Sequence, residues 1–100
     1  MKKFKLLFTQ QAREEITKSR NYYNKQLSGL GNEFTNELKK TIDQIKQNPL
    51  QFPECFPPIH QANTSRFPFS IYYHIQDLVI KVIAVFHNSR NPDKWKERKD

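Results

Sequence analysis

The stretch that decides the fold is FPFSIYYHIQDLVIKVIAVF, residues 67–86. Its first half alternates apolar and polar residues, whereas its second half is an apolar run interrupted only by Lys81. Gln76 and Asp77 lie between the halves and predict the turn of a β-hairpin. Because a one-residue slip would break the apolar match across the hairpin, the pattern predicts one register. The predicted pairs are Ile75 with Leu78, Tyr73 with Ile80, Ile71 with Val82, Phe69 with Ala84 and Phe67 with Phe86.

This register also assigns the opposite face of the hairpin. That face receives a basic and aromatic group, namely Arg66, Tyr72, Lys81 and His87, and three apolar residues that need a cover, namely Val79, Ile83 and Val85, besides Pro68, Ser70 and His74. Cations of this kind bind phosphates, and an aromatic ring stacks on a base. The face is therefore a candidate surface for nucleic acid or another target. The alternative is an ordinary half-exposed sheet face that the residues after the hairpin partly cover.

The rest of the chain predicts a helical hairpin and two further strands. Residues 3–8 alternate as a short strand, and Thr9 can cap the helix that follows over residues 10–27. Residues 28–31 break the helix, with Gly29 suited to a left-handed conformation, and a second helix runs over residues 32–47 until Asn48-Pro49 ends it. Four prolines in residues 49–58 predict a stiff crossover with Phe52 and Phe56 against the core, and residues 59–66 form a weak strand. The predicted fold class is α+β, with the order β-α-α-β-β-β, an antiparallel sheet, and the helical hairpin packed on one face.

Composition bounds the possible functions. One hundred residues predict a single domain over residues 1–100. The net charge of +7 favours a polyanion or an acidic protein as partner, with a plain basic surface as the alternative. One cysteine, Cys55, excludes an internal disulfide, and neither the three histidines nor the two glycines form a metal or phosphate motif, so we expect no metal and no cofactor. No apolar run approaches the ~18 residues of a membrane span, so we expect no membrane partner. The apolar stretch at the start ends at Thr9, which argues against secretion, and the single cysteine fits a reducing cytoplasm.

The segment after the hairpin carries a second group of candidate residues. Asn91-Pro92 can open a short helix, which places Trp95 about one turn inside it and Arg98 about one turn later on the same side. In one interpretation Trp95 packs at the sheet edge while Arg90 and Arg98 are solvated. In the other, Arg90 lies beside His87 and Arg66 at the open end of the sheet and contacts a target.

An ordered set of short motifs runs from Phe4 to Arg98. The motifs are Ala12 with Glu15 and Ile16; Tyr22-Tyr23; Gly29-Leu30-Gly31 with Phe34; Leu38 and Ile42; Asn48-Pro49 with Phe52-Pro53; Arg66 to Tyr73; and Ala84 to Pro92 with Trp95 and Arg98. The set ends in His-x-x-Arg-x-Pro-x-x-Trp-x-x-Arg and resembles the RelE/ParE superfamily of toxins from type II toxin–antitoxin modules. The ParE-like members are the more similar ones. The predicted order of elements agrees with the fold of that superfamily.

The resemblance implies a toxin that arrests growth and that a cognate antitoxin neutralises by direct binding. An acidic, partly disordered antitoxin would suit the charge of +7 and would cover apolar residues that lack a cover within the chain. ParE-like members bind DNA gyrase and need no catalytic residue, whereas RelE-like members cut mRNA in the ribosome. A different class, a nucleic-acid-binding module without toxicity, also stays open.

Each target would use the candidate residues differently. For RNA cleavage, Arg66, Lys81 and Arg90 would hold the phosphate, His87 would be the general acid or base, and Tyr72 would stack. For target binding without chemistry, the same cations and Tyr72 would act together with Trp95 and Arg98. Nuclease members usually carry a Tyr or His near the end of the chain, and the sequence after Arg90 has neither. We therefore expect the ParE-like mode.

Overall fold

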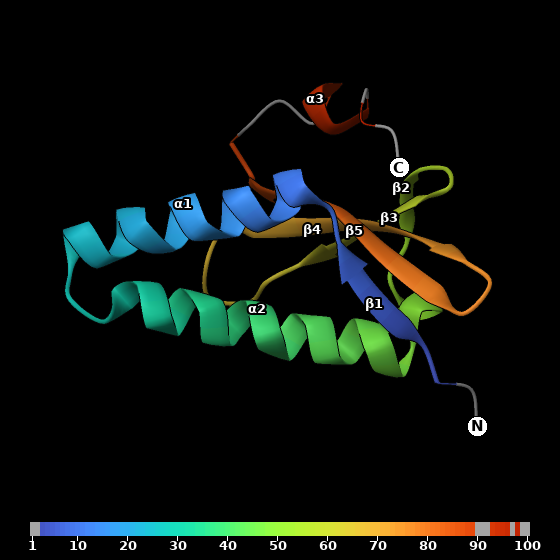
Figure 1. Cartoon of the computed structure of the whole chain (residues 1–100), viewed down its shortest axis with the longest axis horizontal. Coiled ribbons are helices and arrows are strands. Elements are labelled where there is room, and N and C mark those ends of the chain that lie inside the picture. Colours follow the sequence, from blue (N-terminus) through green and yellow to red (C-terminus); the bar gives the residue numbers. More distant parts are fainter. Residues whose placement is uncertain (1–2, 90–92, 97, 99–100) are drawn as a thin grey trace.

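A hairpin of two long helices covers one face of a five-stranded sheet (Figure 1). The computed structural model describes residues 3–89, 93–96 and 98. Within these residues, no helix is long and apolar enough to cross a membrane. The elements are β1 (Lys5–Phe8), α1 (Gln10–Gln26), α2 (Leu30–Gln47), a 3₁₀ turn η1 (Pro49–Gln51), β2 (Glu54–Phe56), β3 (Ile59–Asn63), β4 (Phe69–Gln76), β5 (Val79–His87) and α3 (Asp93–Lys96).

The predicted α+β class and the helical hairpin are confirmed, and the sheet has two features that the sequence did not predict. The strand order is β1-β5-β4-β3-β2, and β1 runs parallel to β5 while the other pairs are antiparallel. The prediction of a wholly antiparallel sheet is therefore wrong for β1. The proline-rich segment also contains the short edge strand β2, which pairs with β3 through a bulge. Three residues at a sheet edge need few ladder bonds, so the nearby prolines do not prevent the strand.

Local signals set the ends of both helices. The Thr9 side chain accepts a hydrogen bond from the Ala12 N–H at 3.1 Å, as the sequence predicted for the cap of α1. Gly29 adopts the left-handed conformation with φ 88°, also as predicted, and reverses the chain. Gly31 lets the first turn of α2 approach α1 so closely that its N–H donates to the Asn24 side-chain oxygen at 2.7 Å. The two helices therefore pack against each other at the hairpin end with almost no space between them.

The main core lies between the helical hairpin and the sheet. Tyr23 and Phe34 of the helices meet Phe67 and Phe69, with ring centroids 4.7–6.1 Å apart in edge-on or tilted arrangements. The remaining buried members are Ala12, Leu38, Ile45, Ala62, Ile71, Tyr73, Ile80, Val82 and Val85. The predicted alternation of β4 is thus confirmed, because its odd-numbered residues face the helices.

The β4–β5 hairpin has a different register from the one that the sequence predicted. Its turn is Asp77-Leu78, and Tyr73 pairs with Val82 instead of Ile80. Leu78 lies in this turn with 46% of its surface exposed, so its predicted pairing with Ile75 is wrong. Because side chains alternate with a period of two, a shift of two residues leaves each face unchanged. The apolar pattern could not distinguish the two registers.

A β-bulge at Ile83 reverses the faces of the remaining part of β5. Tyr73 pairs with Val82 and Tyr72 pairs with Ala84, which leaves Ile83 as the extra residue. Beyond the bulge, Ile71 pairs with Val85 and Phe69 with His87, so Val85 and His87 face the helices. Ala84 and Phe86 face outward instead, where they cluster with Tyr72 and Ile83. The predicted faces of Ala84, Val85, Phe86 and His87 are wrong for this reason.

The segment after β5 covers part of the outer face. The Lys96 ammonium lies 4.8 Å from the centre of the Phe56 ring, and the Arg98 guanidinium lies 5.0 Å from that of Phe86. Phe56 is 45% exposed, so its predicted place in the core is wrong, whereas Phe52 packs against the core as predicted. The outer apolar cluster therefore receives a cover from within the chain.

Candidate functional site

Arg66 is bound to the helical hairpin rather than to the sheet residues predicted as its neighbours. Its guanidinium contacts the Glu33 carboxylate of α2 at 2.9 Å and lies 5.6 Å from the centre of the Phe67 ring. Ser65 donates a hydrogen bond to Glu37 of α2 at 2.8 Å, and this bond lowers the pKa of the Glu37 carboxyl. Both side chains of the Arg66–Glu33 pair are about half exposed, so the pair adds little stability. Together these bonds fix the loop before β4 to α2.

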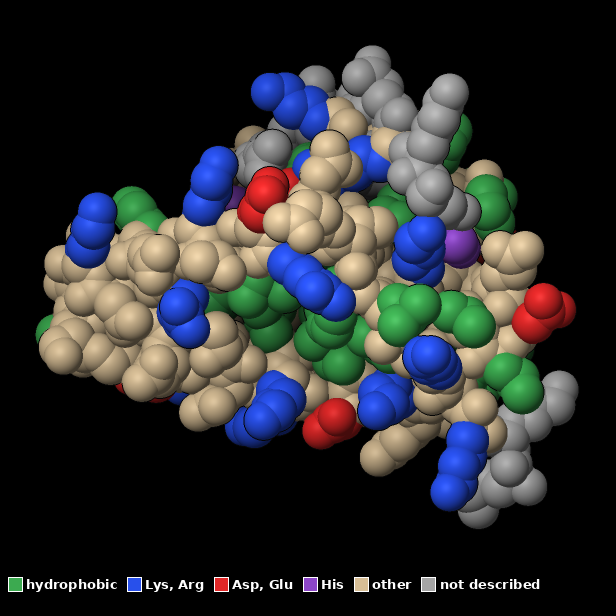
Figure 2. Space-filling view, viewed as in Figure 1, with side chains coloured by type: hydrophobic (Ala, Val, Ile, Leu, Met, Phe, Trp, Pro, Cys, Tyr) green, Lys and Arg blue, Asp and Glu red, His purple; other side chains and the backbone are tan. Residues whose placement is uncertain are grey.

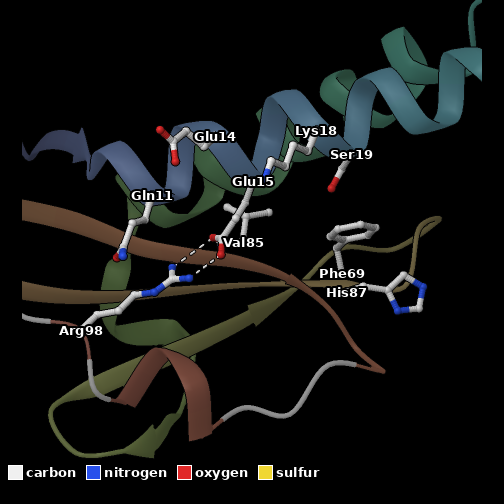
Figure 3. Close-up of a pocket in the computed structure, with 9 residues that line it drawn as sticks. All are labelled: Gln11, Glu14, Glu15, Lys18, Ser19, Phe69, Val85, His87 and Arg98. Atoms are coloured by element: carbon white, nitrogen blue, oxygen red, sulfur yellow. Dashed lines mark hydrogen bonds and ion pairs between the residues drawn. The ribbon is translucent and has the colours of Figure 1, made fainter.

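His87 lies at the end of β5 on the helix-facing side. Its Nδ1 accepts the Ser89 backbone N–H at 3.1 Å, so a neutral ring carries its proton on Nε2. The ring packs edge-on against Phe69, with centroids 5.2 Å apart. His87 and Arg98 both line a cleft of about 320 Å³, and residues of α1 form another of its walls (Figure 3).

Tyr72 and Lys81 lie on the opposite face of the sheet from His87. Tyr72 is 6% exposed and packs edge-on against Phe86, with ring centroids 6.1 Å apart. Lys81 pairs with His74 across the hairpin and is half-buried. The bulge at Ile83 causes this separation, because it turns His87 away from the face that carries the other two residues.

Among the candidate residues that the structure describes, Arg98 makes the most extensive polar contacts. It forms a two-point ion pair with Glu15 of α1, including a 3.1 Å bond from Nη1 to Oε1, and both side chains are nearly buried (Figure 3). Arg98 Nη1 also donates to the Ile83 carbonyl at 2.7 Å. Removing one partner of such a buried pair typically costs about 3–5 kcal/mol. The alternative in which Arg98 is solvated is therefore wrong, because this side chain is bound inside the fold.

Sequence reasoning had singled out Glu15 only as part of a motif. The residue accepts hydrogen bonds from both the Arg98 guanidinium and the Val85 backbone N–H, the latter at 3.0 Å. Glu15 and Arg98 are 83 positions apart, and no spacing rule connects residues at such a distance. The remaining predictions cannot be placed: Arg90 and the Trp95 side chain lie outside the described residues.

A second surface feature is an apolar groove between β1, α1 and α2. Its volume is about 420 Å³, and Figure 2 shows hydrophobic side chains gathered there with Lys and Arg around them. Exposed Lys39 and Lys46 stand on its α2 side, and β1 is an edge strand of the sheet. The apolar lining consists of Leu6, Phe8, Ile16, Leu38 and Ile42. The sequence analysis did not identify this groove, because its walls come from three separate elements.

The described residues contain no group of three or more His, Cys, Asp or Glu that could hold a metal ion. Cys55 is exposed, and partial burial of its thiol raises the pKa above the ordinary value. A raised pKa leaves less reactive thiolate at neutral pH.

Comparison with known proteins places this fold in a family. Residues 6–92 match the model of the ParE toxin of the type II toxin–antitoxin system parDE. The chain belongs to the ParE toxin family. Among solved structures, the chromosomal ParDE toxin–antitoxin system from P. aeruginosa superposes with a TM-score of 0.75 at 15% sequence identity. The match covers 84% of this chain and 95% of that one, and at such low identity it shows a shared ParE fold alone. A search of curated proteins gave no match.

Proposed function

We propose that this member of the ParE family is a toxin that arrests growth by inhibiting DNA gyrase, and that an acidic antitoxin neutralises it by direct binding. The family match over residues 6–92 supports a toxin with an antitoxin partner. The placement of His87 carries the choice of target. It supports inhibition by binding rather than RNA cleavage.

RNA cleavage needs a general acid or base and cations around one phosphate. In this chain His87 lies on the helix-facing side of β5, whereas Lys81 lies on the outer face. Arg66 is directed to Glu33 of α2. Lys81 therefore cannot share a phosphate with His87, and Arg66 is already paired with a carboxylate. Inhibition of gyrase by a bound protein requires no such convergence.

The apolar groove between β1, α1 and α2 supports the antitoxin part of the proposal. The groove has an apolar lining, and exposed Lys39 and Lys46 stand beside it with one acid, Asp43, between them in the sequence. This excess of positive charge suits an amphipathic segment with acidic residues along one side. The edge of β1 can add a strand from the same partner. The net charge of +7 would speed association with such a chain.

The target is tested by inducing the chain in bacteria without its neighbouring gene and by two assays on the purified protein. We expect growth arrest, inhibition of gyrase supercoiling, and no cleavage of ribosome-bound mRNA. His87→Ala should retain the gyrase effect. Cleavage of mRNA that is lost in His87→Ala, with gyrase unaffected, would reverse the assignment in favour of a RelE-like nuclease. Normal growth at good soluble expression, with salt-sensitive binding of RNA or DNA, would indicate the non-toxic module instead.

The antitoxin surface is tested with the protein encoded by the adjacent reading frame. Reversing both groove lysines, in Lys39→Glu with Lys46→Glu, should weaken its binding about tenfold or more at low salt. The matched control reverses Lys25 and Lys94, which are exposed and lie outside the groove. Equal loss of binding in both double variants would show that only net charge matters and would contradict the groove assignment.

A further inference from the structure

The outer edge of β5 loses its neighbouring strand halfway along its length. β1 pairs with β5 only from Val79 to Val82, because the chain turns at Thr9 into α1. The Thr9 N–H still donates to the Val82 carbonyl at 3.0 Å, and this is the last backbone bond along that edge within the described residues. From Ile83 onward, the backbone groups on this edge must find other partners or remain unsatisfied in a mostly buried place.

Side chains supply partners for two of these groups. The Ile83 carbonyl accepts a short bond from the Arg98 guanidinium at 2.7 Å and a longer one from the Thr9 hydroxyl at 3.4 Å. The Val85 N–H donates to the Glu15 carboxylate at 3.0 Å. Arg98 and Glu15 also bind each other at two points, so each holds the other against the strand. The bulge lies at this position, where the regular ladder to β4 is interrupted as well.

The same contacts fix the segment that follows β5. The Arg98 guanidinium lies over Phe86 and so closes the outer cluster of Tyr72, Ile83, Ala84 and Phe86. α3 comes immediately before Arg98 in the chain, and its Lys96 lies over the Phe56 ring. A single ion pair therefore connects α1, the bulge of β5 and the segment that covers the outer face (Figures 1 and 3).

We propose that Glu15 and Arg98 form a clamp that replaces a neighbouring strand at the edge of β5 and holds α3 over the outer face of the sheet. Arg98 is a positioning residue in this device. The clamp determines where α3 lies and keeps the bulge closed, so its loss should open this edge of the sheet before the helical hairpin and the main core. The proposal is independent of the target of the toxin.

Amide hydrogen exchange of the full chain tests the clamp at the strand. In Arg98→Ala and Glu15→Ala, the Val85 amide should exchange at least about tenfold faster than in the wild type. The Thr9 amide, one step earlier on the same edge, should keep its rate. Arg98→Lys retains the charge but offers one ammonium nitrogen in place of the forked guanidinium, so it should restore part of the protection. Arg66→Ala breaks the exposed pair with Glu33 and is the matched control that should leave the Val85 amide unchanged.

Fluorescence anisotropy tests the clamp at α3, because the single tryptophan, Trp95, lies in that helix. Anisotropy should fall in Arg98→Ala and Glu15→Ala and should stay at the wild-type value in Arg66→Ala. If an alanine variant does not fold, the same comparisons apply to Arg98→Lys and Glu15→Gln. Unchanged Val85 exchange and unchanged anisotropy would overturn the proposal. Equal acceleration of the Thr9 and Val85 amides would overturn it too, because the pair would then support the whole fold rather than one edge.

Discussion

The close approach of the two long helices at Gly31 leads to a prediction that opposes simple helix propensity. Gly31 lies in the first turn of α2, where alanine would normally stabilise a helix by up to about 1 kcal/mol. A Cβ at this position would overlap the Arg20 backbone carbonyl and lie 2.6 Å from the Asn24 side-chain carbon. A backbone carbonyl inside α1 cannot rotate away, so one helix must move. We therefore expect Gly31→Ala to destabilise the protein.

The expected size follows from three contributions. Inserting a methyl group into a tight interface costs about 1–3 kcal/mol. The Gly31 N–H bond to Asn24 is strained or lost, at a cost of about 1 kcal/mol. Helix propensity returns at most about 1 kcal/mol. The net loss is about 1–3 kcal/mol, which for a domain of this size corresponds to a fall in melting temperature of roughly 5–20 °C.

Chemical and thermal unfolding, followed by far-ultraviolet circular dichroism, measures this loss. Gly29→Ala is the matched control, since Gly29 has φ 88° but nothing within 4 Å of the added Cβ. Its cost should be limited to the left-handed backbone, about 1–2 kcal/mol, and should leave the packing of the helices unchanged. A Gly31→Ala protein as stable as the wild type, or more stable, would refute the argument from close helix contact.

Three further predictions concern the core and the loops. Val82→Asp would bury an unpaired charge at a fully buried position, so we expect no folded protein by circular dichroism. Tyr73→Phe should cost about 1–3 kcal/mol in denaturant unfolding, because it leaves the Pro49 carbonyl without the 2.6 Å hydroxyl donor. Burial raises the Tyr73 pKa above its ordinary value of 10, so the Tyr73 hydroxyl ionises in the unfolded chain before it ionises in the folded one. The stability of the wild type should therefore fall as pH rises past 10, and the stability of Tyr73→Phe should fall less steeply. The Ser65 hydrogen bond lowers the Glu37 pKa, so this carboxylate should add to the free energy of unfolding above pH 4.5 and lose that contribution in acid. In a series of unfolding measurements at different pH, Glu37→Gln should lack this loss.

The elements of the fold could be predicted from sequence because each has a strong local cause. Thr9 caps α1, Gly29 reverses the chain, and Asn48-Pro49 ends α2, each through the conformation of one or two residues. The odd-numbered residues of β4 face the core because the strand alternates strictly. The candidate surface was less predictable, since it depended on the register of β5, a strand that is apolar on both faces.

The sequence by itself determined the α+β class, the helical hairpin, the β4–β5 hairpin and the resemblance to ParE-like toxins. Only the tertiary structure decided the two-residue shift in register, the bulge at Ile83 and therefore the side to which His87 points. It also decided that β1 runs parallel to β5 and that Arg98 binds Glu15. The physical reason is the range of the interactions. Caps, turns and alternation act between near neighbours in the sequence. The bulge of β5 instead has partners from distant positions, because Glu15 lies 70 positions before Val85 and Arg98 lies 15 positions after Ile83.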